Sequence, residues 1–147
     1  MKAIRLLLFI FFTATGIANA QTNKNHFVDL PSPHQDTTFE RVLQLLLSSD
    51  YFVLSADKSS GLIQCKIVMD DNKSKVFTKL KIDILEYNLL IQNNRNKGSR
   101  IYIQANVKQK IRSPKVNDDG IYIDDNGVTK NPKYYDPIIA FLKSNLI

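Results

Sequence analysis

The chain has 147 residues, of which 44% are hydrophobic, and its 20 Lys and Arg against 14 Asp and Glu give a formal net charge of +6. This length and composition are enough for one globular domain with a core of its own. The basic residues are dispersed among Asp and Asn, which excludes a polyanion-binding tail made from a run of like charges. Cys65 is the only cysteine, which excludes an intrachain disulfide.

The first 20 residues have the pattern of a cleavable secretory signal peptide. Lys2 and Arg5 precede an apolar run, and the segment ends in Ala18-Asn19-Ala20. The uncharged stretch is shorter than the about 20 apolar residues of a membrane span, and Gln21 stands where a lipoprotein would carry a cysteine. We expect cleavage between Ala20 and Gln21, which leaves a mature protein without a lipid or transmembrane anchor, in the periplasm or secreted. The alternative is a retained N-terminal helix.

Residues 21–36 are polar and rich in turn-forming residues, and Pro31 and Pro33 exclude a helix there. We predict a flexible tether in which Phe27-Val28 is the docking point. The segment also holds both histidines and two acids, at His26, Asp29, His34 and Asp36. Their spacing matches no pattern of metal ligands, so we predict no metal site.

A helix is predicted from Thr37, because Thr37-x-x-Glu40 has the form of a capping box. Apolar residues then follow at the spacing of one helical face, at Phe39, Val42, Leu43 and Leu46. The helix is expected to end near Ser48-Ser49.

After Asp50 the apolar pattern changes to a period of two, which predicts antiparallel strands. The expected strands are Tyr51–Ala56, Leu62–Met69, Val76–Ile84, Tyr87–Gln92 and Arg100–Arg112. Polar residues mark turns at Asp57–Gly61 and Asp70–Ser74, a tight corner at Glu86–Asn88 and a loop at Asn93–Ser99.

Alternation assigns each of the longer predicted strands an inner and an outer face. In Leu62–Met69, the odd-numbered residues are apolar and Gln64 and Lys66 face outward. In Val76–Ile84 the expected inner residues are Val76, Leu80, Ile82 and Ile84, and the expected outer ones are Lys79, Lys81 and Asp83. In Arg100–Arg112 the odd-numbered residues face inward and the even-numbered ones outward.

Residues Ser113–Lys130 are predicted to form a long loop, with a brief strand at Ile121-Tyr122-Ile123 before an Asn126-Gly127 turn. The acids of this loop do not have the spacing of a calcium-binding loop. A second helix is predicted with Asp136 as its cap and Pro137 as its first residue. Tyr134-Tyr135, just before it, are expected to be packing residues.

This order of elements predicts one α+β domain over residues 37–147, a two-layer fold with a curved antiparallel sheet of about five strands and both helices on one face. The run Phe39–Gly61 and the closing Tyr135-Asp136-Pro137 helix resemble small exported bacterial domains of unknown function with a TATA-box-binding-protein-like, helix-grip fold. The domains of the outer-membrane assembly lipoprotein BamC are similar in style. This chain departs from BamC because it has neither the lipid-bearing cysteine nor a second domain. The resemblance implies the fold, and a fold does not by itself imply a function.

We predict that the chain is not an enzyme and needs no cofactor. Both histidines lie in the predicted tether, away from any nucleophile of the domain, and Cys65 lies on the apolar side of its strand. The paired carboxylates lie in turns, where solvent leaves them unactivated. A glycine-rich phosphate loop is absent from the sequence.

The remaining candidate site is the outer face of the sheet, for which we predict a basic binding surface. Its expected members are Lys66, Lys79, Lys81, Tyr102, Lys108, Lys110 and Arg112, with Asp83 as the only acid. The alternative is that these lysines keep an open sheet soluble. The expected partner is an envelope protein or an anionic envelope surface and not nucleic acid.

We therefore predict a non-enzymatic binding or assembly module of the bacterial cell envelope. The alternative is a small periplasmic hydrolase or ligand-pocket domain. A deep pocket between helices and sheet, lined by convergent polar groups, would favour that alternative, and a filled core would favour the binding module.

Overall fold

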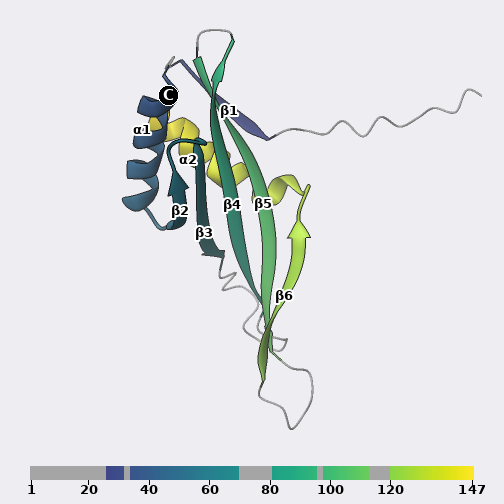
Figure 1. Cartoon of the computed structure of the whole chain (residues 1–147). Helices are drawn as coiled ribbons and strands as arrows, with labels where there is room; N and C mark the ends of the chain where they lie inside the picture. Colours follow the sequence, from purple (N-terminus) through teal and green to yellow (C-terminus); the bar gives the residue numbers. More distant parts are fainter. Residues whose placement is uncertain (1–25, 32–33, 70–80, 96–97, 113–119) are drawn as a thin grey trace, which may run out of the picture.

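The computed structural model describes residues 26–31, 34–69, 81–95, 98–112 and 120–147 (Figure 1). They form an α+β fold with a six-stranded antiparallel open sheet and two α-helices. In chain order the elements are β1 (Phe27–Leu30), α1 (Gln35–Leu47), β2 (Phe52–Asp57), β3 (Leu62–Met69), β4 (Lys81–Asn94), β5 (Gly98–Arg112), β6 (Ile121–Val128), the short 3-10 helix η2 (Pro132–Tyr134) and α2 (Asp136–Leu146).

The strands are ordered β1-β5-β4-β3-β2, and β6 pairs with β5 on the same side as β1. β1 pairs with residues 99–102 of β5, and β6 pairs with residues 106–112. Between the two strands, the Ile103 amide donates to the His26 carbonyl at 2.8 Å, and the Thr129 amide donates to the Ala105 carbonyl at 3.0 Å. The outer edge of β5 is therefore bonded along most of its length, first to β1 and then to β6 (Figure 1).

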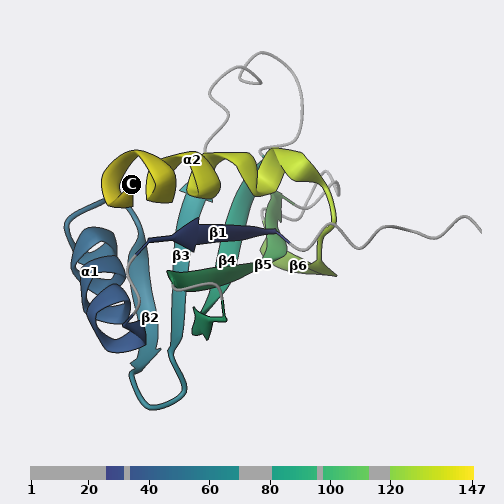
Figure 2. The same cartoon turned by 90° about the horizontal axis from the view of Figure 1, so that it is seen from above.

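One hydrophobic core joins the two helices to the sheet (Figure 2). The helices contribute one apolar stripe each, Phe39, Val42 and Leu46 from α1 and Ile138, Leu142 and Leu146 from α2. The three central strands contribute their odd-numbered residues, Ile63, Cys65, Leu85, Tyr87, Leu89, Ile91, Ile101, Ile103, Ala105 and Val107. Because all of these side chains are buried, each of the large ones contributes about 1.5–3 kcal/mol relative to exposure.

Several predicted elements are confirmed. β3 has the predicted bounds, and its apolar odd-numbered residues lie in or against the core. β5 alternates as predicted, with Ile101, Ile103, Ala105 and Val107 buried. The turn before β3 is closed by Gly61, whose φ of 74° is a left-handed conformation that glycine adopts without strain. The Ile91 amide donates to the Gly61 carbonyl at 2.9 Å, which ties this turn to β4.

The predicted corner at Glu86–Asn88 is wrong, because β4 runs through it as one strand from Lys81 to Asn94. The predicted faces of its first residues are also wrong. Asp83 is on the core side, where it accepts hydrogen bonds from the Gln109 amide at 2.9 Å and the Tyr134 hydroxyl at 3.1 Å. Residues 76–80 of the predicted strand lie outside the described residues.

The faces of β4 were misjudged because the strand extends past the helices at its first residues (Figure 1). At that end Ile82 and Ile84, predicted to be inner residues, are half-buried on the side away from the core, and polar Asp83 lies opposite them. The apolar pattern of these few residues therefore assigns them to the wrong faces. A shift of one residue exchanges the two faces of a strand.

The predicted tether is corrected over its second half. Phe27–Leu30 form β1, whose Val28 and Leu30 are buried while Phe27 and Asp29 face solvent. Alternating apolar residues allow this segment to pair with β5 and cover part of the core. Residues 21–25 lie outside the described ranges.

The predicted start of α1 is also corrected, because the helix begins at Gln35 and no side chain of its own caps it. The Gln35 amide instead donates to the Asn93 side chain at 2.9 Å, which caps the helix from the end of β4. Thr38 is buried and donates to the Ser99 hydroxyl at 3.1 Å. Glu40, the other end of the predicted capping box, forms an ion pair with Lys58 at 2.6 Å.

The brief strand predicted at Ile121-Tyr122-Ile123 extends further as β6, through the predicted Asn126-Gly127 turn. Its pairing with β5 shifts register between Asn106 and Lys108, and Gly127 there has a φ of 71°. The glycine is therefore part of a bulge rather than a hairpin turn.

An amide row on the open face as the candidate functional site

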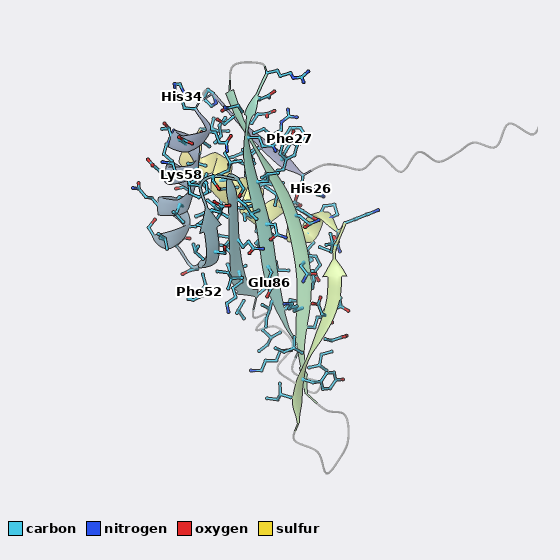
Figure 3. The ribbon with its side chains drawn as sticks, viewed as in Figure 1. His26, Phe27, His34, Phe52, Lys58 and Glu86 are labelled. Atoms are coloured by element: carbon cyan, nitrogen blue, oxygen red, sulfur yellow. The ribbon has the colours of Figure 1, made fainter. Side chains whose placement is uncertain are left out.

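The candidate site lies on the side of the sheet away from the core, which we call the open face. It consists of the even-numbered residues of the central strands, Leu62, Gln64, Lys66, Val68, Ile84, Glu86, Asn88, Leu90, Tyr102, Gln104, Asn106, Lys108 and Lys110. Figure 3 shows the sheet from this side, with Phe27 of β1 and Phe52 of β2 at its two margins and Glu86 between them. Phe27 is 39% exposed and Phe52 is 63% exposed.

Three carboxamide side chains cross the centre of the open face in a row. Strand register places Gln64 beside Asn88 and Asn88 beside Gln104. The Gln64 amide donates to Asn88 Oδ1 at 2.8 Å, and the Asn88 amide donates to Gln104 Oε1 at 3.1 Å. We call these three residues the amide row.

A hollow lies on each side of the amide row, and the two hollows share Gln64 and Asn88. The first hollow has a volume of about 490 Å³ and is completed by His26, Leu62, Leu90, Tyr102, Ile103 and Gln104. The second has a volume of about 360 Å³ and is completed by Leu54, Glu86, Tyr87, Asn106, Asp125, Gly127 and Val128. The amide row is therefore a polar ridge between two neighbouring depressions.

Opposite charges are paired around the second hollow. The Lys108 ammonium lies 2.8 Å from Glu86 and 4.0 Å from Asp125. The hydrogen bond to Glu86 raises the pKa of Lys108. Lys66 lies over the Phe52 ring, 5.0 Å from its centroid. These lysines are held by groups of the protein itself.

At the other end of the open face, Arg100 forms two hydrogen bonds with Asp29, at 2.6 and 2.8 Å. The Arg100 guanidinium also stacks on the Phe27 ring, 3.9 Å from its centroid. The hydrogen bond from Arg100 lowers the pKa of Asp29. This pair connects β1 to β5 and leaves little net charge beside the first hollow.

Lys66, Tyr102, Lys108 and Lys110 of the predicted basic surface lie on the open face. Lys81 pairs in register with Ile111, and both are odd-numbered, like the core-side residues of β4 and β5. Arg112 pairs in register with Ile121. Lys79, Ala20 and Gln21 lie outside the described residues. The expected single acid, Asp83, is on the core side, whereas Glu86 and Asp125 bring negative charge to the open face.

Sequence reasoning missed Asn88 as a site residue, because it was assigned to the predicted corner. The usable signal was the alternation of Glu86 and Asn88 with buried Leu85, Tyr87 and Leu89, which continues the period of two through the supposed turn. Phe27 and Phe52 were missed as margins of the face, because an isolated exposed aromatic residue carries no information about its neighbours in space.

The side chains of Cys65 and His26 are engaged in packing, and His26 also lines the first hollow. Burial raises the pKa of the Cys65 thiol to about 12, so the thiol is protonated at neutral pH. His26 stacks on Tyr135 with ring centroids 3.5 Å apart, and Tyr135 is buried, as its predicted packing role requires. Among the described residues, no group of three or more His, Cys, Asp and Glu is placed to hold a metal ion.

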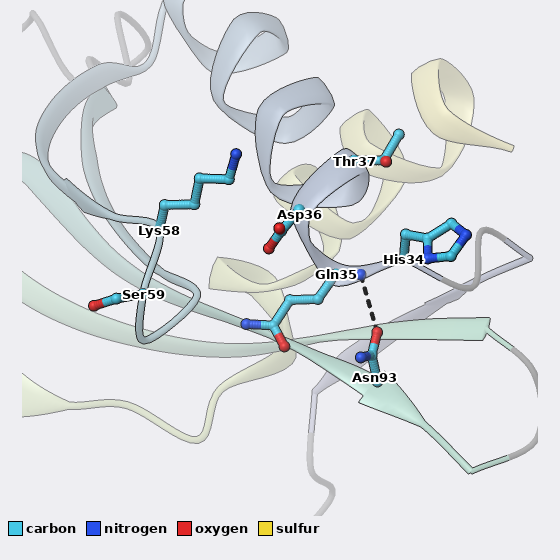
Figure 4. Close-up of a pocket in the computed structure, with 7 residues that line it drawn as sticks. All are labelled: His34, Gln35, Asp36, Thr37, Lys58, Ser59 and Asn93. Atoms are coloured by element: carbon cyan, nitrogen blue, oxygen red, sulfur yellow. Dashed lines mark hydrogen bonds between the residues drawn. The ribbon is translucent and has the colours of Figure 1, made fainter.

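A further hollow, of about 840 Å³, lies at the start of α1 and is lined by His34, Gln35, Asp36, Thr37, Lys58, Ser59 and Asn93 (Figure 4). Three of its polar residues already serve the fold. Asn93 caps the helix, Lys58 pairs with Glu40, and the Ser59 amide and hydroxyl both donate to Asp57. We therefore place the candidate site on the open face.

A comparison with known protein families finds no match to this chain, and a comparison with curated proteins finds none either. Within the described ranges, no helix has the length and apolar character needed to cross a membrane.

Proposed function

We propose that the chain is a non-enzymatic binding module of the bacterial cell envelope and that the open face is its ligand-binding surface. The observation that carries this proposal is the pair of hollows joined by the amide row. Clefts that combine apolar walls with a few placed polar groups are the usual form of a binding site. Seven of the exposed large hydrophobic side chains belong by register or lining to this face or its margins, namely Phe27, Phe52, Leu54, Val68, Ile121, Ile123 and Val128.

The location in the proposal comes from the first 20 residues, whose pattern supports export and cleavage before Gln21. For the architecture we propose a two-layer arrangement of the TATA-box-binding-protein-like, helix-grip kind, with both helices on one face of the sheet. The common core of α1, α2 and the odd-numbered sheet residues supports this arrangement. It leaves the other face available to a ligand.

The paired charges favour an uncharged partner surface over an anionic one. An anionic partner would have to compete with Glu86 and Asp125 for Lys108, and with Asp29 for Arg100. Exchanging one ion pair for another contributes little to the free energy of binding. Of the two partners expected from sequence, an envelope protein or an anionic envelope surface, the anionic surface is therefore the less supported. A neutral component of the envelope fits the paired charges better.

The test is capture of envelope components by the mature protein, analysed for proteins, glycans and lipids by mass spectrometry. Three proteins are compared: the unaltered chain, a Phe52→Ser/Leu54→Ser variant at the margin of the open face, and a Leu47→Ser control on exposed α1 surface. We expect a component that the first and third proteins retain and the second loses. Equal capture by all three would refute the open face as the binding surface.

A further inference from the structure

We propose that the first hollow binds a neutral saccharide, whose hydroxyl groups are hydrogen-bonded by the amide row. This inference rests on the proposed function of the open face and names the chemical class of its ligand.

The amide row has unused capacity for both donating and accepting. Each carboxamide carries two N–H donors and an oxygen with two lone pairs, and the two bonds within the row use one donor and one acceptor site each. Gln64 at one end keeps its whole oxygen and one N–H, and Gln104 at the other end keeps both N–H groups. A ligand along the row therefore meets acceptors at one end and donors at the other, which suits hydroxyl groups because each is both donor and acceptor.

The rest of the first hollow is apolar apart from the side chains of His26 and Tyr102. Leu62 and Leu90 form one row across the strands with Tyr102, next to the amide row. No Asp, Glu, Lys or Arg is among the residues that line this hollow. A pyranose ring fits such a lining, because its C–H groups contact apolar side chains while its hydroxyls contact the amides.

Other ligand classes fit the first hollow less well. A phosphate or nucleic acid is bound chiefly by Lys and Arg, and neither residue type is among those that line this hollow. Its basic side chain, His26, is stacked on Tyr135. An acyl chain would displace water from the donors and acceptors that the amide row does not use internally and would offer them no hydrogen bond, at a cost in free energy. An extended peptide binds to sheets chiefly by pairing with a strand edge, whereas Asn88 lies on the central strand β4 between β3 and β5.

The experiment is a nuclear magnetic resonance titration of the mature protein with neutral hexasaccharides of glucose and of N-acetylglucosamine. We expect shifts of the side-chain amide signals of Gln64, Asn88 and Gln104, with a Kd of about 1 mM or tighter. Asn88→Leu and Gln104→Leu each remove hydrogen bonds while leaving an apolar side chain on the face. Each is expected to weaken binding about tenfold.

The matched control is Gln44→Leu, the same substitution at an exposed position of α1, which should bind like the unaltered chain. A neutral hexapeptide of Ser and Asn serves as the competing ligand class. The inference is overturned if neither saccharide shifts the amide signals, or if the peptide shifts them and the saccharides do not. If capture on the open face persists under either result, the proposed function stands and only the ligand class is wrong.

Discussion

At Gly61 the backbone conformation and a neighbouring backbone atom both disfavour a side chain. Its φ is 74°, and an added Cβ would lie 2.4 Å from the Ile91 carbonyl oxygen, a backbone atom. We expect Gly61→Ala to lower the free energy of unfolding by about 2–4 kcal/mol, because left-handed strain adds to a backbone clash. Denaturation in urea measures the change.

Gly127→Ala is the matched control for this substitution. Gly127 has a similar φ of 71°, but its added Cβ would meet no described atom within 4 Å. Only the cost of the left-handed conformation remains, about 1–2 kcal/mol. Equal losses for the two variants would show that the contact between Gly61 and β4 does not constrain the turn.

The Asp29–Arg100 ion pair predicts a pH-dependent contribution to stability. Because the pKa of Asp29 is lowered in the folded protein, the pair stabilises the fold above the ordinary carboxyl value of 3.8, and this contribution is lost as the pH falls through the lowered pKa. The Asp29 side chain is 49% exposed, so the contribution is at most about 1 kcal/mol. Asp29→Asn should therefore destabilise the protein at pH 7, and its effect should shrink as the pH falls below 3.8. Thermal unfolding over this pH range measures the change, and an effect that stays constant across the range would contradict it.

At the scale of elements, two adjacent threonines at the start of α1 have different environments. Thr37 is exposed and caps nothing, whereas Thr38 is buried and bonded to Ser99. Thr38→Val should cost about 1 kcal/mol through the lost buried hydrogen bond, and Thr37→Ala less than about 0.5 kcal/mol. Urea denaturation of both variants gives the comparison. A loss of about 1 kcal/mol in Thr37→Ala would instead support the capping box predicted from sequence.

The junction of β5 with β4 and β6 gives a second comparison between neighbouring positions. Lys108 lies between Glu86 and Asp125, while Lys110 pairs in register with Ile82 and Ile123. Lys108→Glu places three carboxylates together and should cost about 1 kcal/mol or more, because like charges across strands repel. Lys110→Glu should change stability by about 0.5 kcal/mol at most. Equal values for the two variants would mean that the ion pairs of Lys108 contribute nothing.

The strand segments predicted well from sequence are those that lie beneath the helices. Side chains of β3 and most of β5 alternate between a buried side and a solvent-exposed side, so the alternation of apolar and polar residues in the sequence identifies the two faces. The prediction divided β4 into two strands, because its polar Glu86 and Asn88 resemble a turn. It also exchanged the two faces of the first residues of β4, because these residues lack the contrast between a buried and an exposed side. β1 was missed because four residues beside a proline give too short a pattern, and only its partner β5 makes it a strand.

At the scale of the whole molecule, the candidate site was only partly predictable. The alternation of apolar and polar residues identified the solvent-exposed side of β5, including Tyr102 and Lys108. It did not identify which residues of other strands lie next to them. The amide row depends on register between three strands, which no single strand encodes. The charge of the face was predicted too high, because the partners of Lys108 come from β4 and β6.

Export predicts a defined mature chain. If the first 20 residues are a signal peptide, the intact mass of the protein recovered from the periplasm or medium should correspond to a chain that begins at Gln21, with or without cyclisation of that residue. Replacing Ala18 and Ala20 by bulky residues should block this processing. A recovered mass that retains residues 1–20 would overturn the proposed localisation.

The pairing of β1 with β5 also constrains how the chain folds. Asp29 and Arg100 are 71 positions apart in the sequence, so the earliest described strand pairs with one that is synthesised much later. Contacts this distant in sequence form late, because the loop between them loses entropy when it closes. We expect a refolding intermediate in which β3, β4 and β5 already exchange slowly with solvent while the amides of β1 still exchange freely. Among the described strands, β1 would then be the last to form its hydrogen bonds.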